Sequence, residues 1–178
     1  MTDHNKVPVA GEHASLEGPG FQVIDGEEVS NSARIGSEWV AIHVNSMCSS
    51  SAAGGRRIDR PSDSLQDAVS RVIAQPGAIA QVNHPNYEWA LRFEDMAAVR
   101  GASLLEIANQ HPFVRNSGDG SHPAVETLWD RLLASGARLY GTATDDMHDL
   151  HRTEADLGYK PRRPGKGWVQ VAAPELAD

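Results

Sequence analysis

Short apolar runs alternate along the chain with polar clusters and with segments of helical spacing. Between residues 64 and 73, apolar side chains recur every three or four positions behind a Ser/Asp capping region, and Pro76-Gly77 ends this helix. Pro123 opens a second helix, and Gly136 stands where a left-handed residue is expected to end it. Alternating strands and helices predict an α/β fold with parallel strands.

The apolar runs that precede polar clusters are interpreted as strands, and residues 89–99 as a further helix. The segment 49–57, rich in Ser, Gly and Arg, is expected to be a mobile loop. A chain of 178 residues with no internal repeat favours a single domain over residues 1–178. The predicted strands cover residues 21–24, 39–42, 78–82, 103–107, 139–143 and 168–171.

Side chains able to bind a metal follow several of these strands at their carboxyl ends. The carboxyl ends of parallel strands share one edge of the sheet, so these side chains are expected to meet there. Asp146 and His148 lie two positions apart, on one side of an extended segment. Oxygen and nitrogen donors without thiolate suit zinc, manganese or iron. The candidate ligands found in this way are Glu28, His43, His84, Asp146 and His148.

The remaining histidines match no motif, and surface or helix-capping roles are expected for them. His151 is the least firmly placed, because three residues separate it from His148 and a helical turn would bring the two together. A single Asp-x-His or His-Pro is more often a hydrogen-bonded turn than a metal site, so the metal hypothesis depends on the whole set. These other histidines are His13, His111, His122 and His151.

Polar residues beside the candidate ligands are expected to support them. Asp145 and Glu27 would hold a neighbouring ligand or face solvent, since adjacent strand residues point opposite ways. Glu106 is a single carboxylate in an apolar strand and needs a partner; with Asn109 it could orient ligands by hydrogen bonds.

Composition narrows the classes of function. The net charge of -8 argues against sequence-independent binding to nucleic acid, and no apolar stretch is long enough for a membrane helix. A soluble, cytoplasmic protein is expected, since the first residues lack the features of a secretory signal. The single cysteine, Cys48, excludes an internal disulfide. A basic cluster at 160–166 is expected to be a solvated loop, with contact to an anionic substrate as the alternative.

Six short motifs, taken in order, resemble the PHP (polymerase and histidinol phosphatase) family of metal-dependent phosphoesterases. The resemblance covers nearly the whole chain and is nearest to the branch that contains carbaryl hydrolase-like proteins. The motifs are Thr2-Asp3-His4-Asn5, Gly26-Glu27-Glu28, His43, Asn83-His84-Pro85, Leu105-Glu106-Ile107-Ala108-Asn109 and Asp145-Asp146-Met147-His148.

This resemblance implies a distorted (β/α)7 barrel with two or three divalent metal ions, incomplete at the amino terminus because the family's first-strand His-x-His motif is absent. One metal would take Glu28, His43 and His84. A second would share Glu28 and add Asp146, and a third would take His4 and His148. The implied catalytic residues are His4, Asp146 and His148, with His4 or His148 as candidate proton donors.

The expected function is hydrolysis of a small phosphomonoester by metal-activated hydroxide. Two alternatives stay open. The branch resemblance suggests a carbamate or carboxylic ester hydrolase of the same fold, and the missing first strand suggests a catalytically inactive metal-binding or scaffold domain.

Overall fold

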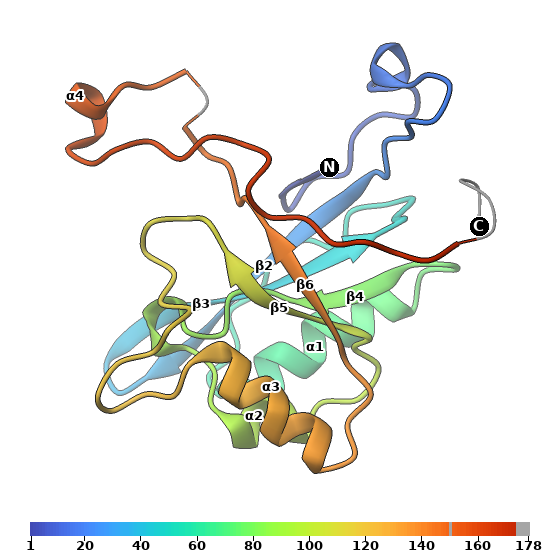
Figure 1. Ribbon diagram of the computed structural model, residues 1–178. Coiled ribbons are helices and arrows are strands. Elements are labelled where there is room, and N and C mark those ends of the chain that lie inside the picture. Colours follow the sequence, from blue (N-terminus) through green and yellow to red (C-terminus); the bar gives the residue numbers. More distant parts are fainter. Residues whose placement is uncertain (150, 174–178) are drawn as a thin grey trace.

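Six strands form one curled, half-barrel sheet in the computed structural model, which describes residues 1–149 and 151–173 (Figure 1). The strands lie side by side in chain order. Their bounds are β1 (Thr2–His4), β2 (Gly26–Ile35), β3 (Glu38–Met47), β4 (Ile79–Val82), β5 (Leu104–Asn109) and β6 (Tyr140–Thr144). The α/β class predicted from the sequence is confirmed.

The sheet is mixed, and the expectation of parallel strands fails at β3. β3 runs antiparallel to both β2 and β4, whereas β1–β2, β4–β5 and β5–β6 are parallel pairs. β2 and β3 form a hairpin with ten paired positions, closed by a two-residue loop in which Gly36 has φ +63°. A positive φ is the conformation that such tight hairpin loops require. His43 therefore lies inside a strand instead of after its end.

Helices cover one face of the sheet, below it in Figure 1. α1 packs on β2, β3 and β4, and α3 packs on β5 and α2. No helix in residues 1–149 and 151–173 is long and apolar enough to cross a membrane. The helices are η1 (Ala14–Leu16), α1 (Pro61–Ile73), η2 (Tyr87–Trp89), α2 (Phe93–Ala98), α3 (Val125–Ala134) and α4 (Glu154–Leu157).

The hydrophobic core lies between these helices and the sheet. Val29, Ile42 and Val44 face the helices and are fully buried against Leu65 and its neighbours on α1. Successive side chains of a strand point to opposite faces. Glu28 and the residues that alternate with this core therefore lie on the other, concave face, and that face is polar.

Two of the strand predictions made from the sequence are wrong. Residues 21–24 make only an isolated bridge between Gly18 and Phe21, and residues 168–171 are irregular. Phe21 is 58% exposed and Trp168 is 65% exposed, so neither run is half-buried as a strand in this sheet would be.

Two other predicted segments also differ. The helix expected over residues 89–99 is split into η2 and α2, with Arg92 extended between them. Segment 49–57, expected to be a mobile loop, is held to the rest of the protein. Glu27 accepts hydrogen bonds from Ala53 N and Gly54 N at 2.6 and 2.7 Å, and Arg71 donates to the carbonyl groups of the same two residues.

Candidate metal centre

Glu28 lies at the centre of a group of imidazoles on the concave face of the sheet. Its Oε1 is 3.0 Å from His43 Nδ1 and 3.4 Å from His84 Nε2, and its Oε2 is 3.2 Å from His4 Nδ1. The side chains come from β1, β2, β3 and the end of β4. Four strands thus bring together residues that are up to 80 positions apart in the chain.

Three of these atoms form a triangle of the size that a tetrahedral metal site requires. The sides are 3.0 Å (His43 to Glu28), 3.2 Å (His43 to His84) and 3.4 Å (His84 to Glu28). Metal–ligand bonds of about 2.0 to 2.1 Å in tetrahedral geometry separate neighbouring ligands by about 3.3 Å. Donor chemistry and spacing therefore fit a zinc-like ion with a fourth position open.

A second, overlapping group also has suitable spacing. The donor atoms of His4, Glu28 and His43 all lie within 4.8 Å of one another, so these three residues could hold a metal ion. The two groups share both Glu28 and His43, so they overlap in one site, in which the two Glu28 oxygens face different imidazoles.

The last two candidate ligands lie at the rim, beyond β6. His148 Nε2 is 3.3 Å from His4 Nε2, which brings together the ends of the two outer strands of the sheet. Asp146 Oδ1 lies 3.4 Å from His148 Nδ1. His4 and His148 thus form a pair, as the resemblance implies, and Asp146 supports one of its members.

A buried hydrogen-bond network fixes the backbone and side chains of the site. Glu106 Oε2 accepts the His84 backbone N–H at 2.7 Å and the Asn109 amide at 3.0 Å, while Oε1 accepts the Thr144 hydroxyl. Asn109 also donates to the Asp146 carboxylate at 3.0 Å. Glu106 has the partners that a buried carboxylate needs, and through Asn109 it links β4, β5 and β6.

Amide side chains also hold the Glu28 carboxylate. Gln81 donates to Asn83 at 3.0 Å, and Asn83 donates to Glu28 Oε1 at 3.0 Å. Two buried oxygens on this face, Asn45 Oδ1 and Gln81 Oε1, have no hydrogen-bond partner among the described residues. Because buried polar groups are nearly always paired, these oxygens indicate that water or another ligand occupies the concave face.

Two candidate ligands have backbone conformations that are unusual for residues other than glycine. His84 has φ +21° and Asp146 has φ +47°, and each follows the end of a parallel strand. Such conformations persist only where neighbouring contacts hold them. The contacts are those made by Glu106 to His84 and by Asn109 to Asp146.

The protonation of the site follows from burial and from these contacts. Burial acts to raise the pKa of Glu28, but hydrogen bonds from His43 and His84 outweigh it and lower that pKa well below its usual range. Burial lowers the pKa of His43. Burial also opposes protonation of His84, yet its contact with Glu28 and the nearby Glu106 charge raise its pKa overall. Burial raises the pKa of Glu106.

Two cavities open onto the donors. One, of about 220 Å³, is lined by His4, His43, His84, Tyr87, His111, Asp146 and His148. The other, of about 400 Å³, lies along the concave face and includes His4, Glu28, Asn45 and Glu106 among its walls. A small molecule can therefore reach the donors without a change of fold.

Sequence reasoning missed His111 and Tyr87. His111 was expected on the surface or as a helix cap, but it lines the cavity, with its ring centroid 5.2 Å from that of His148. Burial lowers the pKa of His111. Its position two residues after Asn109, at the end of β5, is the signal that could have identified it.

The other three histidines lie outside the cavity, as expected. His13 pairs with Asp25 at 2.8 Å, and His122 stacks on Trp89 with ring centroids 4.0 Å apart. His151 is exposed and does not reach the donors.

Glu27 and Asp145 bind loop backbone and, among the described residues, make no hydrogen bond to a candidate ligand. Glu27 is fully buried against Ala53 N and Gly54 N, so neither of its two expected roles, holding a ligand or facing solvent, is found. Asp145 accepts backbone N–H groups from Gly165, Lys166 and Gly167, which closes the base of the excursion 147–164.

Comparison of the chain with family models, curated proteins and solved structures finds no match. The description of the site therefore depends on its own geometry.

Proposed function

We propose that the protein is a metal-dependent hydrolase that cleaves a small phosphomonoester. The observation that supports this most directly is the triangle of His43 Nδ1, His84 Nε2 and Glu28 Oε1, with sides between 3.0 and 3.4 Å. Divalent ions bound there would make hydroxide available near neutral pH and stabilise negative charge on the phosphoryl oxygens. Hydrolysis adds a water oxygen to phosphorus, breaks the bond from phosphorus to the leaving alcohol, and delivers a proton to that alcohol.

The protein's own residues hold and orient the reacting groups. Glu28, with its pKa lowered, is anionic and offers both oxygens, and its orientation is set by Asn83. Asp146 and His148 line the same cavity as His43 and His84, and the Asn109 amide, itself held by Glu106, binds Asp146. In the proposed reaction, His4 or His148 supplies the proton to the leaving alcohol.

Elemental analysis of the purified chain tests the ligand assignment. Glu28→Ala and His84→Ala should each lower the amount of bound zinc or manganese, because each removes one corner of the triangle. His122→Ala is the matched control, since His122 lies on Trp89 outside the cavity. Unchanged metal content in the first two variants would refute the assignment.

Turnover distinguishes the two ester classes. The metal-loaded protein should hydrolyse an aryl phosphate faster than the corresponding aryl carbamate, and EDTA should abolish the activity. Faster turnover of the carbamate would replace the phosphoesterase proposal with the carbamate or carboxylic ester hydrolase. Retained metal without turnover of either would favour an inactive metal-binding domain.

A further inference from the structure

One wall of the donor cavity includes two aromatic rings that belong to none of the ligand motifs, those of Tyr87 and His111, and the ring of Phe113 follows His111 beyond the cavity lining. The ring centroids are 5.3 Å apart from the donor His84 to Tyr87, 6.2 Å apart from Tyr87 to His111, and 5.4 Å apart from His111 to Phe113. All three contacts are edge-to-face, with interplanar angles between 64° and 78°. This is the arrangement that aromatic pairs prefer.

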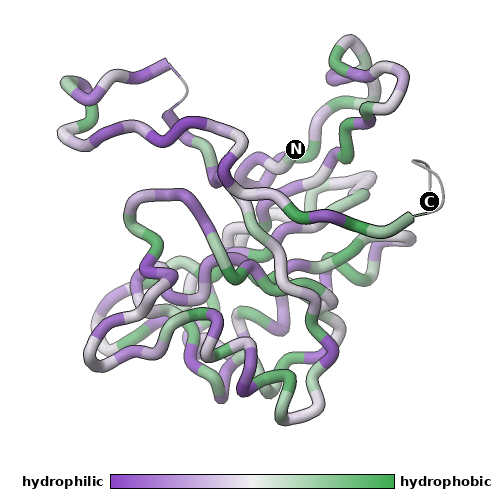
Figure 2. Tube along the Cα trace, viewed as in Figure 1, coloured by the Kyte–Doolittle hydropathy of each residue, from purple (hydrophilic) through white to green (hydrophobic). Residues whose placement is uncertain are grey.

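The series continues from the cavity to the excursion that follows β6. Phe113 contacts the Tyr159 ring at 5.4 Å, and the Tyr159 hydroxyl donates to Asp149 at 2.8 Å. The excursion itself is mostly hydrophilic (Figure 2). Phe113 is nonetheless 52% exposed, an apolar ring left open to solvent beside a polar centre. The wall therefore has free aromatic surface near the donors.

The charge of the residues that line the cavity limits the kinds of ligand that the aromatic wall can bind. The lining contains Asp146 and histidines, and it contains no lysine or arginine among the described residues. Nothing there would neutralise a second anionic group on a substrate. The Tyr87 hydroxyl makes no hydrogen bond to the described part of the chain, so its ring and hydroxyl are both available to a ligand.

We propose that Tyr87, His111 and Phe113 bind a planar, uncharged aromatic group of the substrate while its ester group lies on the metal donors. This inference rests on the proposed function and adds the substrate class to it. A cavity of about 150 Å³ is large enough for benzene. The volume of about 220 Å³ leaves room for a ring and the ester group beside it. A phenyl group placed in the cavity against Tyr87 and His111, with its outer edge toward Phe113, extends the edge-to-face series.

Binding of phosphonates tests the inference without depending on turnover, because their carbon–phosphorus bond is not hydrolysed. Calorimetry on the manganese-loaded chain compares phenylphosphonate, cyclohexylphosphonate and methylphosphonate. Aromatic pairing beyond burial of area is equivalent to about 2- to 12-fold in affinity. Phenylphosphonate should bind at least about 3-fold more tightly than cyclohexylphosphonate and about 10-fold more tightly than methylphosphonate.

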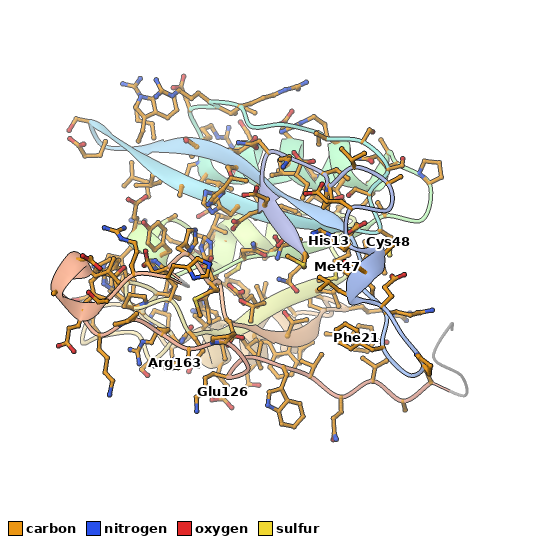
Figure 3. The ribbon with its side chains drawn as sticks, turned by 90° about the horizontal axis from the view of Figure 1, so that it is seen from above. His13, Phe21, Met47, Cys48, Glu126 and Arg163 are labelled. Carbon is orange, nitrogen blue, oxygen red and sulfur yellow. The ribbon has the colours of Figure 1, made fainter. Side chains whose placement is uncertain are left out.

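Two variants and one control locate the effect. Phe113→Leu and Tyr87→Leu each replace a ring by an aliphatic group, and each should reduce the preference for phenyl over cyclohexyl to about 1- to 2-fold. This preference is a ratio of two affinities measured on the same variant, so a change at the metal donors affects both phosphonates alike. Phe21→Leu is the matched control. Phe21 is similarly exposed, at 58%, and lies on the opposite side of the molecule from the excursion that carries Arg163 (Figure 3). It should leave all three affinities unchanged.

The outcomes separate this inference from the proposed function. Equal affinity for phenyl- and methylphosphonate, or a phenyl preference that survives both substitutions, would overturn the aromatic wall while the metal centre still binds phosphonate. If the chain takes up no manganese and none of the three phosphonates binds in its presence, both proposals are overturned. Circular dichroism of each variant establishes that it is folded.

Discussion

Replacement of Glu106 tests the network that positions the site, and its cost can be worked out from the contacts. Glu106 is 2% exposed and accepts three hydrogen bonds, from the His84 backbone, the Asn109 amide and the Thr144 hydroxyl. Glu106→Leu leaves the His84 N–H and one hydrogen of the Asn109 amide without an acceptor, while that amide keeps its bond to Asp146 and the half-buried Thr144 hydroxyl can turn to water. Each unpaired buried group costs about 1 to 3 kcal/mol, so we expect a loss of at least about 2 kcal/mol in the free energy of unfolding.

Glu106→Gln separates hydrogen bonding from charge. The glutamine oxygen can accept from His84 and Asn109, and the Thr144 hydroxyl can turn to accept from the glutamine amide, so we expect a change within about 1 kcal/mol. Because the pKa of Glu106 in the folded protein is raised, folding favours its protonated form. Stability of the parent protein should therefore fall as the pH rises from the unfolded pKa through the folded one, and the glutamine variant should lack this fall.

Urea denaturation of metal-free protein measures both effects, with Glu126→Leu as the control. Glu126 is exposed on α3 and lies away from the site (Figure 3). The control should change stability by less than about 0.5 kcal/mol. A Glu106→Leu variant as stable as the parent, or a glutamine variant as destabilised as the leucine variant, would refute the reasoning.

Three further predictions concern the surroundings of the site. Glu27→Ala removes the acceptor of two loop N–H groups and should lower the free energy of unfolding by about 2 kcal/mol or more in urea denaturation, with faster hydrogen exchange over residues 49–57. Gly55→Ala places a Cβ against the carbonyl of Ser30 and should cost about 1 to 3 kcal/mol, whereas Gly18→Ala meets no atom within 4 Å and should be neutral in the same assay. Metal binding requires neutral imidazole, and the pKa of His84 is raised. The apparent affinity for zinc, measured by competition with a chelator, should therefore fall by about tenfold per pH unit below that pKa. An affinity that stays constant down to about pH 5 would contradict this.

Most of the regular structure could be predicted from the sequence because local patterns specify it. The helices α1 and α3 have apolar faces at helical spacing and clear ends, and Gly136 adopts the left-handed conformation expected of it, with φ +93°. The apolar runs of β4 and β5 place Ala80, Val82 and Leu105 in the core, so their composition marks them as strands. β6 buries only Thr142, and its prediction depended on the apolar run that begins at Leu139.

β2 escaped prediction because polar residues occupy positions that usually hold apolar ones. Glu27 and Asn31 alternate with Val29 on the helical face and are buried there. They are stable because distant groups satisfy them: loop N–H groups bind Glu27, and Asn31 donates to Ser64 O at 2.9 Å. Partners more than 20 residues away cannot be read from a local pattern. The exposed run 21–24 looked more like a strand than β2 itself.

For the site, the sequence by itself determined which donors exist: carboxylates and imidazoles in six ordered motifs, several of them next to apolar runs. Only the tertiary structure decided how these donors meet, because the antiparallel course of β3 places His43 in mid-strand, paired with Ser30 and diagonal to Glu28 on the same face, and pairing across β1 to β4 sets distances of 3.0 to 3.4 Å between side chains far apart in the chain. It also brought His111 and Tyr87 to the cavity wall, since loop conformation depends on packing and buried hydrogen bonds that no local spacing encodes.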